Sequence, residues 1–226
     1  MKKKINQKNA AFILMTIISI LIFTLGCKKD TKKPDPGHSA TGNSNIIYTD
    51  VNPDSAILSI TDSFNLDLNN DAVPDFKFQK QLSGIRCGHN PEVPTTNVLR
   101  IKISLTPADS DNAIITNVSD FVLALDSAAS INSDSLWKTG TQILLENTTP
   151  TSCINVYEHA GYWLNAADKY IGLKFIKNNN VYYGWARLSS TYSGSTPSAI
   201  LSAQLILKDY AYNSVPNQPI LAGQTK

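Results

Sequence analysis

Short runs of alternating apolar and polar residues, separated by turn-forming residues, constrain the fold of this chain more than any other feature. The clearest case is the pair Lys169–Ile176 and Val181–Leu188, which the polar segment Lys177-Asn178-Asn179-Asn180 connects. Alternation places successive side chains on opposite faces of a strand, and a short Asn-rich linker favours a tight turn. The sequence therefore predicts a β-hairpin at residues 169–188.

The same pattern recurs along most of the chain. Val98–Leu105 alternates Ile101, Ile103 and Leu105 with polar residues, which is typical of a half-buried strand. Further candidate strands are Ile57–Ile60, Ser63–Leu68, Asp75–Lys80, Phe121–Leu125, Ile143–Leu145, Cys153–Tyr157, Ala199–Leu207 and Lys208–Tyr212. Only Ser127–Ser135 is compatible with a short helix. About ten short strands with frequent turns predict an all-β fold, a single antiparallel β-sandwich of either plain or jelly-roll type.

The N-terminus has the pattern of an export signal. Three lysines follow Met1, and the apolar segment Ala10–Leu25 is sixteen residues long, which is short for a spanning helix of about 20 residues. The segment ends in Gly26-Cys27, which resembles the lipobox of bacterial lipoproteins and departs from it at Thr24, where that family usually has Leu. The resemblance implies cleavage before Cys27 and acylation of its thiol. The alternative is an uncleaved signal anchor.

This interpretation divides the chain into three parts. Residues 1–26 are the signal peptide, 27–43 the lipidated N-terminus with a flexible tether rich in charge, Pro and Gly, and 44–226 the β-sandwich domain. Several acyl chains give a stable membrane anchor. We therefore expect a lipid-anchored protein of the cell envelope, with the outer membrane as the expected location.

The charge of the domain differs from that of the whole chain. The chain has a formal net charge of +2, but the part from Asn43 onward holds 12 basic and 16 acidic residues. A mildly acidic domain without a basic patch is unsuited to the phosphate backbone of a nucleic acid. We therefore expect no nucleic-acid partner.

Two cysteines remain beyond the lipid site. Cys87 and Cys153 are an even pair in an exported chain, which favours a disulfide bond. The alternatives are two free thiols, or a metal pair completed by His89 or His159. Without a C-x-x-C spacing, the metal alternative has little support.

One acidic loop has the spacing of a calcium site. Residues Asp67 to Asp75 read D-x-N-x-D-x-x-x-D, which supplies side-chain oxygens from Asp67, Asn69, Asp71 and Asp75 and the carbonyl of Val73. Calcium takes six to eight such oxygens. The loop resembles the D-x-[DN]-x-D-G-x-x-D loops between strands of secreted bacterial proteins, but it has Ala72 at the usual Gly position and Phe78 at the position of the bidentate Glu. We expect a structural calcium ion; the alternative is an Asx-rich turn.

A second candidate site lies on the predicted strand at Val181–Leu188. Tyr183, Trp185 and Arg187 share one face, and aromatic rings beside a polar donor suit sugar recognition. The alternative is a core position, which is more common for a Trp in a central strand. The function predicted from these features is a surface binding or adhesion module, with glycan as the leading ligand class.

Catalytic motifs do not stand out in the sequence. It contains no H-E-x-x-H, no G-x-S-x-G and no Gly-rich phosphate loop. Pairs of carboxylates could serve a glycosidase, but nothing in their spacing favours one pair. The alternative function is therefore a secreted hydrolase of envelope or scavenged polysaccharide, and no catalytic residue is assigned.

The C-terminal third resembles a known group of proteins. The segments Tyr183–Leu188 (YGWARL), Leu207–Tyr212 (LKDYAY) and Pro219–Gly223 (PILAG) are similar to uncharacterised secreted β-rich bacterial proteins, many of which carry a PEP-CTERM sorting signal. That group commonly has an early acidic D-x-[DN]-x-D loop, matched here by Asp67–Asp75. The resemblance implies export and a β-rich fold, and it implies no activity.

Overall fold

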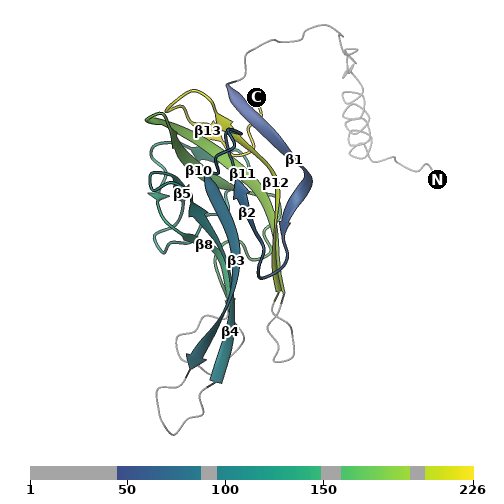
Figure 1. Ribbon diagram of the computed structural model, residues 1–226. Helices are drawn as coiled ribbons and strands as arrows, with labels where there is room; N and C mark the ends of the chain where they lie inside the picture. Colours follow the sequence, from purple (N-terminus) through teal and green to yellow (C-terminus); the bar gives the residue numbers. More distant parts are fainter. Residues whose placement is uncertain (1–44, 88–95, 149–158, 194–201) are drawn as a thin grey trace, which may run out of the picture. The chain divides into compact units, whose positions relative to one another are not determined.

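The computed structural model describes residues 45–87, 96–148, 159–193 and 202–226, and within these ranges it contains thirteen strands and no helix. Figure 1 shows how these strands are arranged. In chain order the strands are β1 (Ile46–Ile57), β2 (Ser63–Leu66), β3 (Phe76–Cys87), β4 (Thr96–Pro107), β5 (Ala113–Ile115), β6 (Ser130–Ile131), β7 (Trp137–Lys138), β8 (Gln142–Thr148), β9 (His159–Ala160), β10 (Lys169–Lys177), β11 (Asn180–Ser193), β12 (Ser202–Asn213) and β13 (Ile220–Leu221). They all belong to one compact unit, Asn43–Lys226.

The strands form two main sheets and one small one. The six-stranded sheet has the order β1-β12-β11-β10-β5-β7, and the five-stranded sheet has the order β2-β3-β4-β8-β9. The third sheet is the pair β13-β6, and the strands of all three sheets pair antiparallel. The predicted all-β antiparallel sandwich is confirmed.

The predicted hairpin at residues 169–188 is also present. β10 and β11 pair from Lys169↔Leu188 to Lys177↔Asn180. The two residues between the strands, Asn178 and Asn179, have φ angles of 51° and 61°. Positive φ at both central residues of a two-residue connection matches a type I′ turn, whose twist suits the strands on either side, and Asn tolerates this conformation well.

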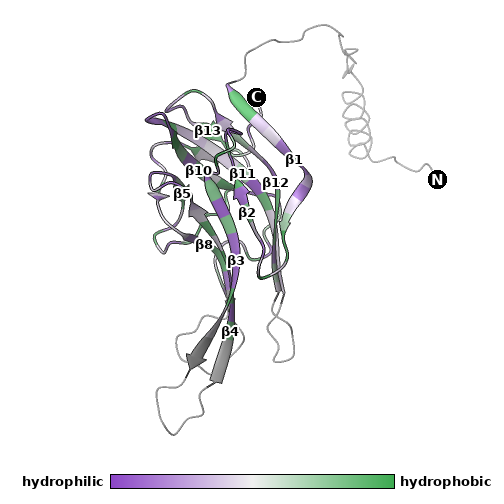
Figure 2. Cartoon of the chain, viewed as in Figure 1, coloured by the Kyte–Doolittle hydropathy of each residue, from purple (hydrophilic) through white to green (hydrophobic). Residues whose placement is uncertain are grey.

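The main core lies between the two large sheets. Alternate residues of the central strands point inward, which Figure 2 shows as apolar and polar segments following one another along each strand. The largest side chains of this core are fully buried, namely Phe76, Phe78, Leu105, Trp163 and Phe175. This packing is the physical reason for the period-two pattern in the sequence.

A second core covers the opposite face of the six-stranded sheet. The small sheet β13-β6 brings Ile131 and Ile220 onto this face, where they pack with Tyr183 and Trp185 of β11. β11 is therefore buried on both faces. This explains why Tyr183, Gly184, Trp185 and Ala186 are all buried in succession.

Three local predictions are wrong. Phe121–Leu125 is not a continuous strand, because it pairs only through isolated bridges such as Phe121↔Ile143 and Leu125↔Tyr170. Ser127–Ser135 forms no helix, because the chain turns at Ala128, with a φ of 65°, and then pairs with the C-terminal segment as β6. The candidate strand Ile57–Ile60 is instead the end of β1 followed by a turn. That turn is closed by Asp62, whose carboxylate accepts the N–H groups of Leu58 and Ser59.

The cysteine predictions fall largely outside this structure. Cys27 and Cys153 lie outside the described residues, and Cys87 ends β3 opposite Thr96. Acylation of Cys27 and the Cys87–Cys153 disulfide therefore remain predictions. The described ranges include no helix of the length and apolarity needed to cross a bilayer.

Candidate cation and ligand site

The acidic loop Asp67–Asp75 connects β2 to β3 and is curled by its own side chains. The carboxylate of Asp67 accepts the N–H groups of Asp71, at 3.1 Å, and Ala72, at 2.6 Å. Asn70 and Ala72 have φ angles of 57° and 69°. Position 6 of the calcium-type loop therefore has the left-handed backbone that normally selects Gly, although the residue is Ala. The backbone of Ala72 thus has the conformation that the predicted loop type needs at this one position.

Asp75 is the buried acid at the base of the loop. It is only 8 % exposed, and its Oδ2 accepts the N–H of Leu68 at 2.8 Å. Burial raises the pKa of Asp75 to about 6; the hydrogen bond from Leu68 opposes this, and the charges of Asp67 and Asp71 add to it. At neutral pH Asp75 is therefore mostly ionised, although its buried surroundings disfavour the ionised form.

Asp71 has a cationic partner from the other sheet. Nζ of Lys177, the last residue of β10, lies 3.0 Å from Oδ2 of Asp71 and 3.5 Å from Oδ1 of Asn69. The hydrogen bond from Lys177 is the main reason that the pKa of Asp71 is lowered. The same contact raises the pKa of Lys177.

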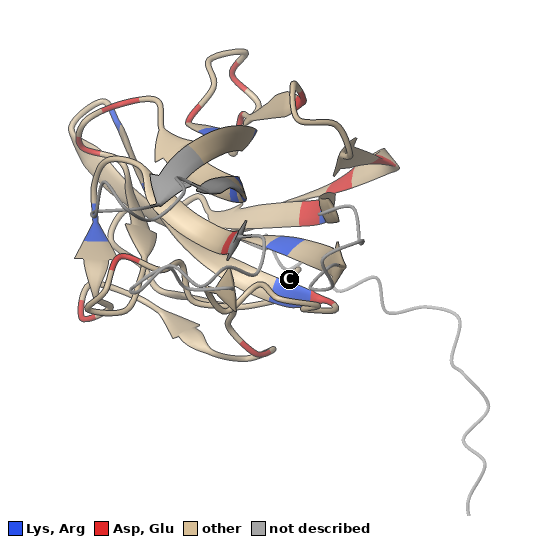
Figure 3. Ribbon diagram, turned by 90° about the horizontal axis from the view of Figure 1, so that it is seen from below, with Lys and Arg blue, Asp and Glu red and all other residues tan. Residues whose placement is uncertain are grey.

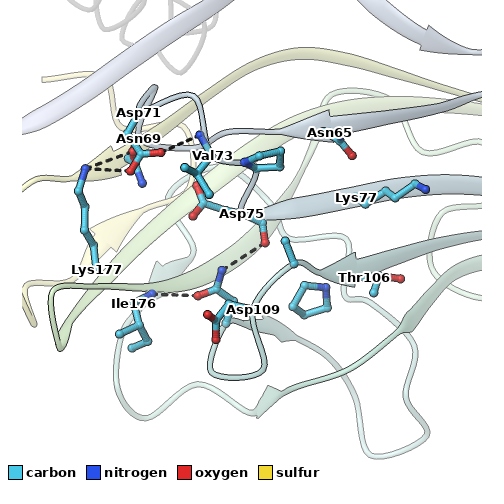
Figure 4. Close-up of a pocket in the computed structure, with 14 residues that line it drawn as sticks. Asn65, Asn69, Asp71, Val73, Asp75, Lys77, Thr106, Asp109, Ile176 and Lys177 are labelled. Carbon is cyan, nitrogen blue, oxygen red and sulfur yellow. Dashed lines mark hydrogen bonds and ion pairs between the residues drawn. The ribbon is translucent and has the colours of Figure 1, made fainter.

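The loop borders a pocket of about 610 Å³. Figure 4 shows that its walls come from the acidic loop, the segment after β4 and the end of β10. Side chains of both charges and several amides line it, namely Asn65, Asn69, Asp71, Asp75, Lys77, Asp109, Asn112 and Lys177. Of the predicted calcium ligands, Asn69, Asp71, Val73 and Asp75 line this pocket, whereas Asp67 does not.

Asn112 fixes the three walls relative to one another. It is 2 % exposed, its Nδ2 donates to the carbonyl oxygen of Asp75, and its Oδ1 accepts the N–H of Ile176. One amide thus connects the acidic loop to β10. Sequence reasoning missed Asn112, Asp109 and Lys177, although an isolated Asn directly before the apolar run Ala113–Ile115 is a usable signal for a buried polar anchor.

The donor chemistry of the loop fits a hard cation, but its arrangement is not that of a formed cage. Carboxylate, amide and carbonyl oxygens are the ligands that calcium prefers. Among the described residues, however, no three His, Cys, Asp or Glu side chains converge closely enough to hold a metal ion. Asp67 is engaged by backbone N–H groups, and Asp71 is engaged by Val73 and Lys177. Calcium binding would require these carboxylates to reorient.

The second predicted site, Tyr183, Trp185 and Arg187, needs a correction. The three side chains do share a face, but Trp185 is 1 % exposed and Tyr183 is 5 % exposed. The rings are covered by the C-terminal segment, so a sugar cannot stack on them in this structure. The core alternative is the one that the burial supports, and Arg187 is engaged by the buried Asp209.

The distribution of charge places many acidic residues on loops. Figure 3 shows Asp and Glu at several connections between strands. Lys and Arg are fewer in this view. Loops of this kind can present carboxylates to solutes without disturbing the sheets. The pocket beside Asp67–Asp75 combines this acidic character with two lysines, Lys77 and Lys177.

Comparisons with known proteins give no further guide to this site. No protein-family model matches the chain, and neither a curated protein nor a solved structure is significantly similar to it. The function is therefore inferred from the pocket and its chemistry.

The raised pKa of Asp75 predicts a particular dependence of stability on pH in the absence of calcium. The native state binds the Asp75 proton more tightly than the unfolded chain does. Its contribution to stability is therefore fully present below pH 4 and is lost as pH rises through 6. Asp75→Asn keeps an oxygen acceptor for Leu68 and removes the charge. With EDTA, we expect this variant to exceed the wild type in unfolding free energy by about 2 kcal/mol at pH 7.5, and to match it near pH 4.

Urea denaturation of residues 43–226 at both pH values measures this difference. Asp109→Asn, which removes an exposed carboxylate from the same pocket, is the control for a general change of charge and should show no such pH-dependent gain. If Asp75→Asn is no more stable than the wild type at pH 7.5, burial of the ionised Asp75 does not destabilise the native state, and the prediction is wrong.

Proposed function

We propose that the chain is a lipid-anchored binding module of the cell envelope, which holds a calcium ion in the Asp67–Asp75 loop and binds a glycan in the adjoining pocket. The observation that carries this proposal is the pocket itself. Its lining includes four of the five predicted calcium ligands, together with further carboxylates, amides and lysines among apolar residues. The acyl chains on Cys27 would hold the module at the membrane.

The loop supports calcium by its chemistry and its backbone. Asp67, Asn69, Asp71 and Asp75 offer side-chain oxygens, and Val73 offers a carbonyl. The buried charge of Asp75 is a second reason to propose calcium. A divalent cation stabilises the ionised form of a carboxylate and would offset the cost of burying it. In this proposal the ion fixes the loop that forms one wall of the pocket.

A glycan is the ligand class that suits the rest of the pocket. Calcium takes six to eight oxygens, so five from the loop leave positions for water or for hydroxyl groups of a ligand. Asn65, Asp109 and Lys77 provide further hydrogen-bonding groups around the same volume. We therefore propose the pocket as the glycan site, in place of the buried face of Tyr183 and Trp185.

We expect calcium to raise the melting temperature of residues 43–226 after metal removal. At 100 times the dissociation constant, binding adds about 2.7 kcal/mol to the stability, which shifts the melting temperature of a domain of this size by roughly 5–10 °C. Asp71→Ala and Asp67→Ala should abolish the shift, whereas Asp126→Ala, an exposed acid away from the loop, should retain it. A glycan array with calcium and with EDTA then tests the ligand, and binding that ignores calcium would contradict this arrangement.

A hydrolase is the second candidate, and one observation favours it. Asp75 has a pKa of about 6 and shares the pocket with Asp71 and Asp109. A carboxyl group that stays partly protonated near neutral pH beside an ionised one is what acid-assisted glycoside hydrolysis uses. Shorter products from the same glycan panel, lost in Asp75→Asn, would favour this candidate over pure binding.

A further inference from the structure

Resting on the proposed calcium site, we propose that Lys177 is an internal cation that competes with calcium for the acidic loop. Its ammonium group contacts Asp71 Oδ2 at 3.0 Å and Asn69 Oδ1 at 3.5 Å. These residues are the third and fifth positions of the calcium-type loop. Figure 4 shows the lysine extended toward both side chains.

The fold holds Lys177 at this place. The residue is the last of β10, pairs with Asn180, and is followed by the two turn residues Asn178 and Asn179, both with positive φ. Next to it, the N–H of Ile176 is bonded to Asn112, which also contacts the backbone of Asp75. The backbone of Lys177 is therefore fixed relative to the loop, and this keeps its side chain within contact of Asp71.

The ammonium and a calcium ion cannot use Asp71 and Asn69 together. Both are cations, and two cations at contact distance from the same carboxylate repel each other. The lysine is tethered, so it loses no translational freedom on binding, but it offers only three donors. Calcium gathers six to eight oxygens. The loop thus has a lysine-bound state, which is the one described here, and a calcium-bound state that requires release of Lys177.

This competition lowers the apparent affinity for calcium. The apparent dissociation constant equals the intrinsic one divided by the fraction of molecules in which the loop is free of the lysine. Exposed ion pairs are weak, so removal of the ammonium is expected to raise the affinity by about two- to fivefold. Lys177 would in this way set the calcium concentration at which the loop changes its state and the pocket wall is remodelled.

The test is calcium titration by calorimetry on the full-length protein in detergent, with calcium chloride as the only ligand. Lys177→Gln should bind calcium about two- to fivefold more tightly than the wild type. Lys177→Arg, which keeps the charge, should stay near the wild type. Lys174→Gln is the matched control, because this lysine is on the same strand but lies over the ring of Trp137.

Two outcomes would overturn the inference and are distinguishable. Equal affinities of Lys177→Gln and the wild type would overturn the competition while leaving the calcium site intact. Absence of calcium binding in every variant would overturn the proposed calcium site and the competition with it. Melting curves in EDTA check the fold of each variant, and the calcium-induced shift should be larger in Lys177→Gln than in the wild type.

Discussion

Replacing Trp185 with Ala is expected to lower the unfolding free energy of the domain by about 3–5 kcal/mol. The side chain is 1 % exposed and packs against Tyr48 and Tyr170, the latter edge-on with 5.2 Å between ring centroids. Its Nε1 donates to the carbonyl oxygen of Gln224, so the ring also holds the C-terminal segment in place. Truncation would leave a cavity between β11 and that segment. Urea unfolding of residues 43–226 measures the loss.

This variant separates the two interpretations of the aromatic face. Tyr162→Ala is the control, because Tyr162 is 51 % exposed and its loss should change stability by no more than about 0.5 kcal/mol. If Trp185→Ala unfolds at the wild-type urea concentration but loses affinity for a glycan, the ring is a ligand platform and its burial in the core carries no energetic weight.

The sequence predicted the sandwich where the determining interactions are local. The hairpin of β10 and β11 depends on alternation within each strand and on two Asn residues that accept positive φ, and both can be read from adjacent positions. The second core could not be predicted in this way. Ile220 covers the sheet face that holds Trp185 only because β13 pairs with β6, a contact between segments about ninety residues apart.

The candidate site shows the same division. The spacing of Asp67, Asn69 and Asp71 identified a loop rich in oxygen donors, and Ala72 has the positive φ that the loop type requires. Lys177 was not predictable, since it meets Asn69 across 108 positions of the chain. Its reach depends on how the two sheets are stacked. Local spacing therefore indicates which oxygen atoms could bind a cation. Only the tertiary structure shows that the ammonium group of Lys177 already contacts two of them.

A half-buried ion pair between β11 and β12 gives the second large prediction. Arg187 and Asp209 are register partners, and the guanidinium donates to both carboxylate oxygens, with Nε–Oδ1 at 2.9 Å and Nη2–Oδ2 at 2.6 Å. The hydroxyl of Tyr48 donates to Oδ2 at 3.0 Å. The Asp209 side chain is 5 % exposed, so its charge depends on these partners rather than on water.

Arg187→Met is expected to cost about 3 kcal/mol, because it leaves the carboxylate of Asp209 buried with only Tyr48 as a donor. Adding Asp209→Asn to that variant should recover a large part of the loss, since the second change removes the unpaired charge. Lys169→Met, which breaks the exposed ion pair with Asp126, is the control and should cost less than about 1 kcal/mol. Denaturation of the two single variants and the double variant completes the cycle. Additive losses in the double variant would show that Arg187 stabilises the sheet through its hydrocarbon stem, and that the charge of Asp209 is solvated without it.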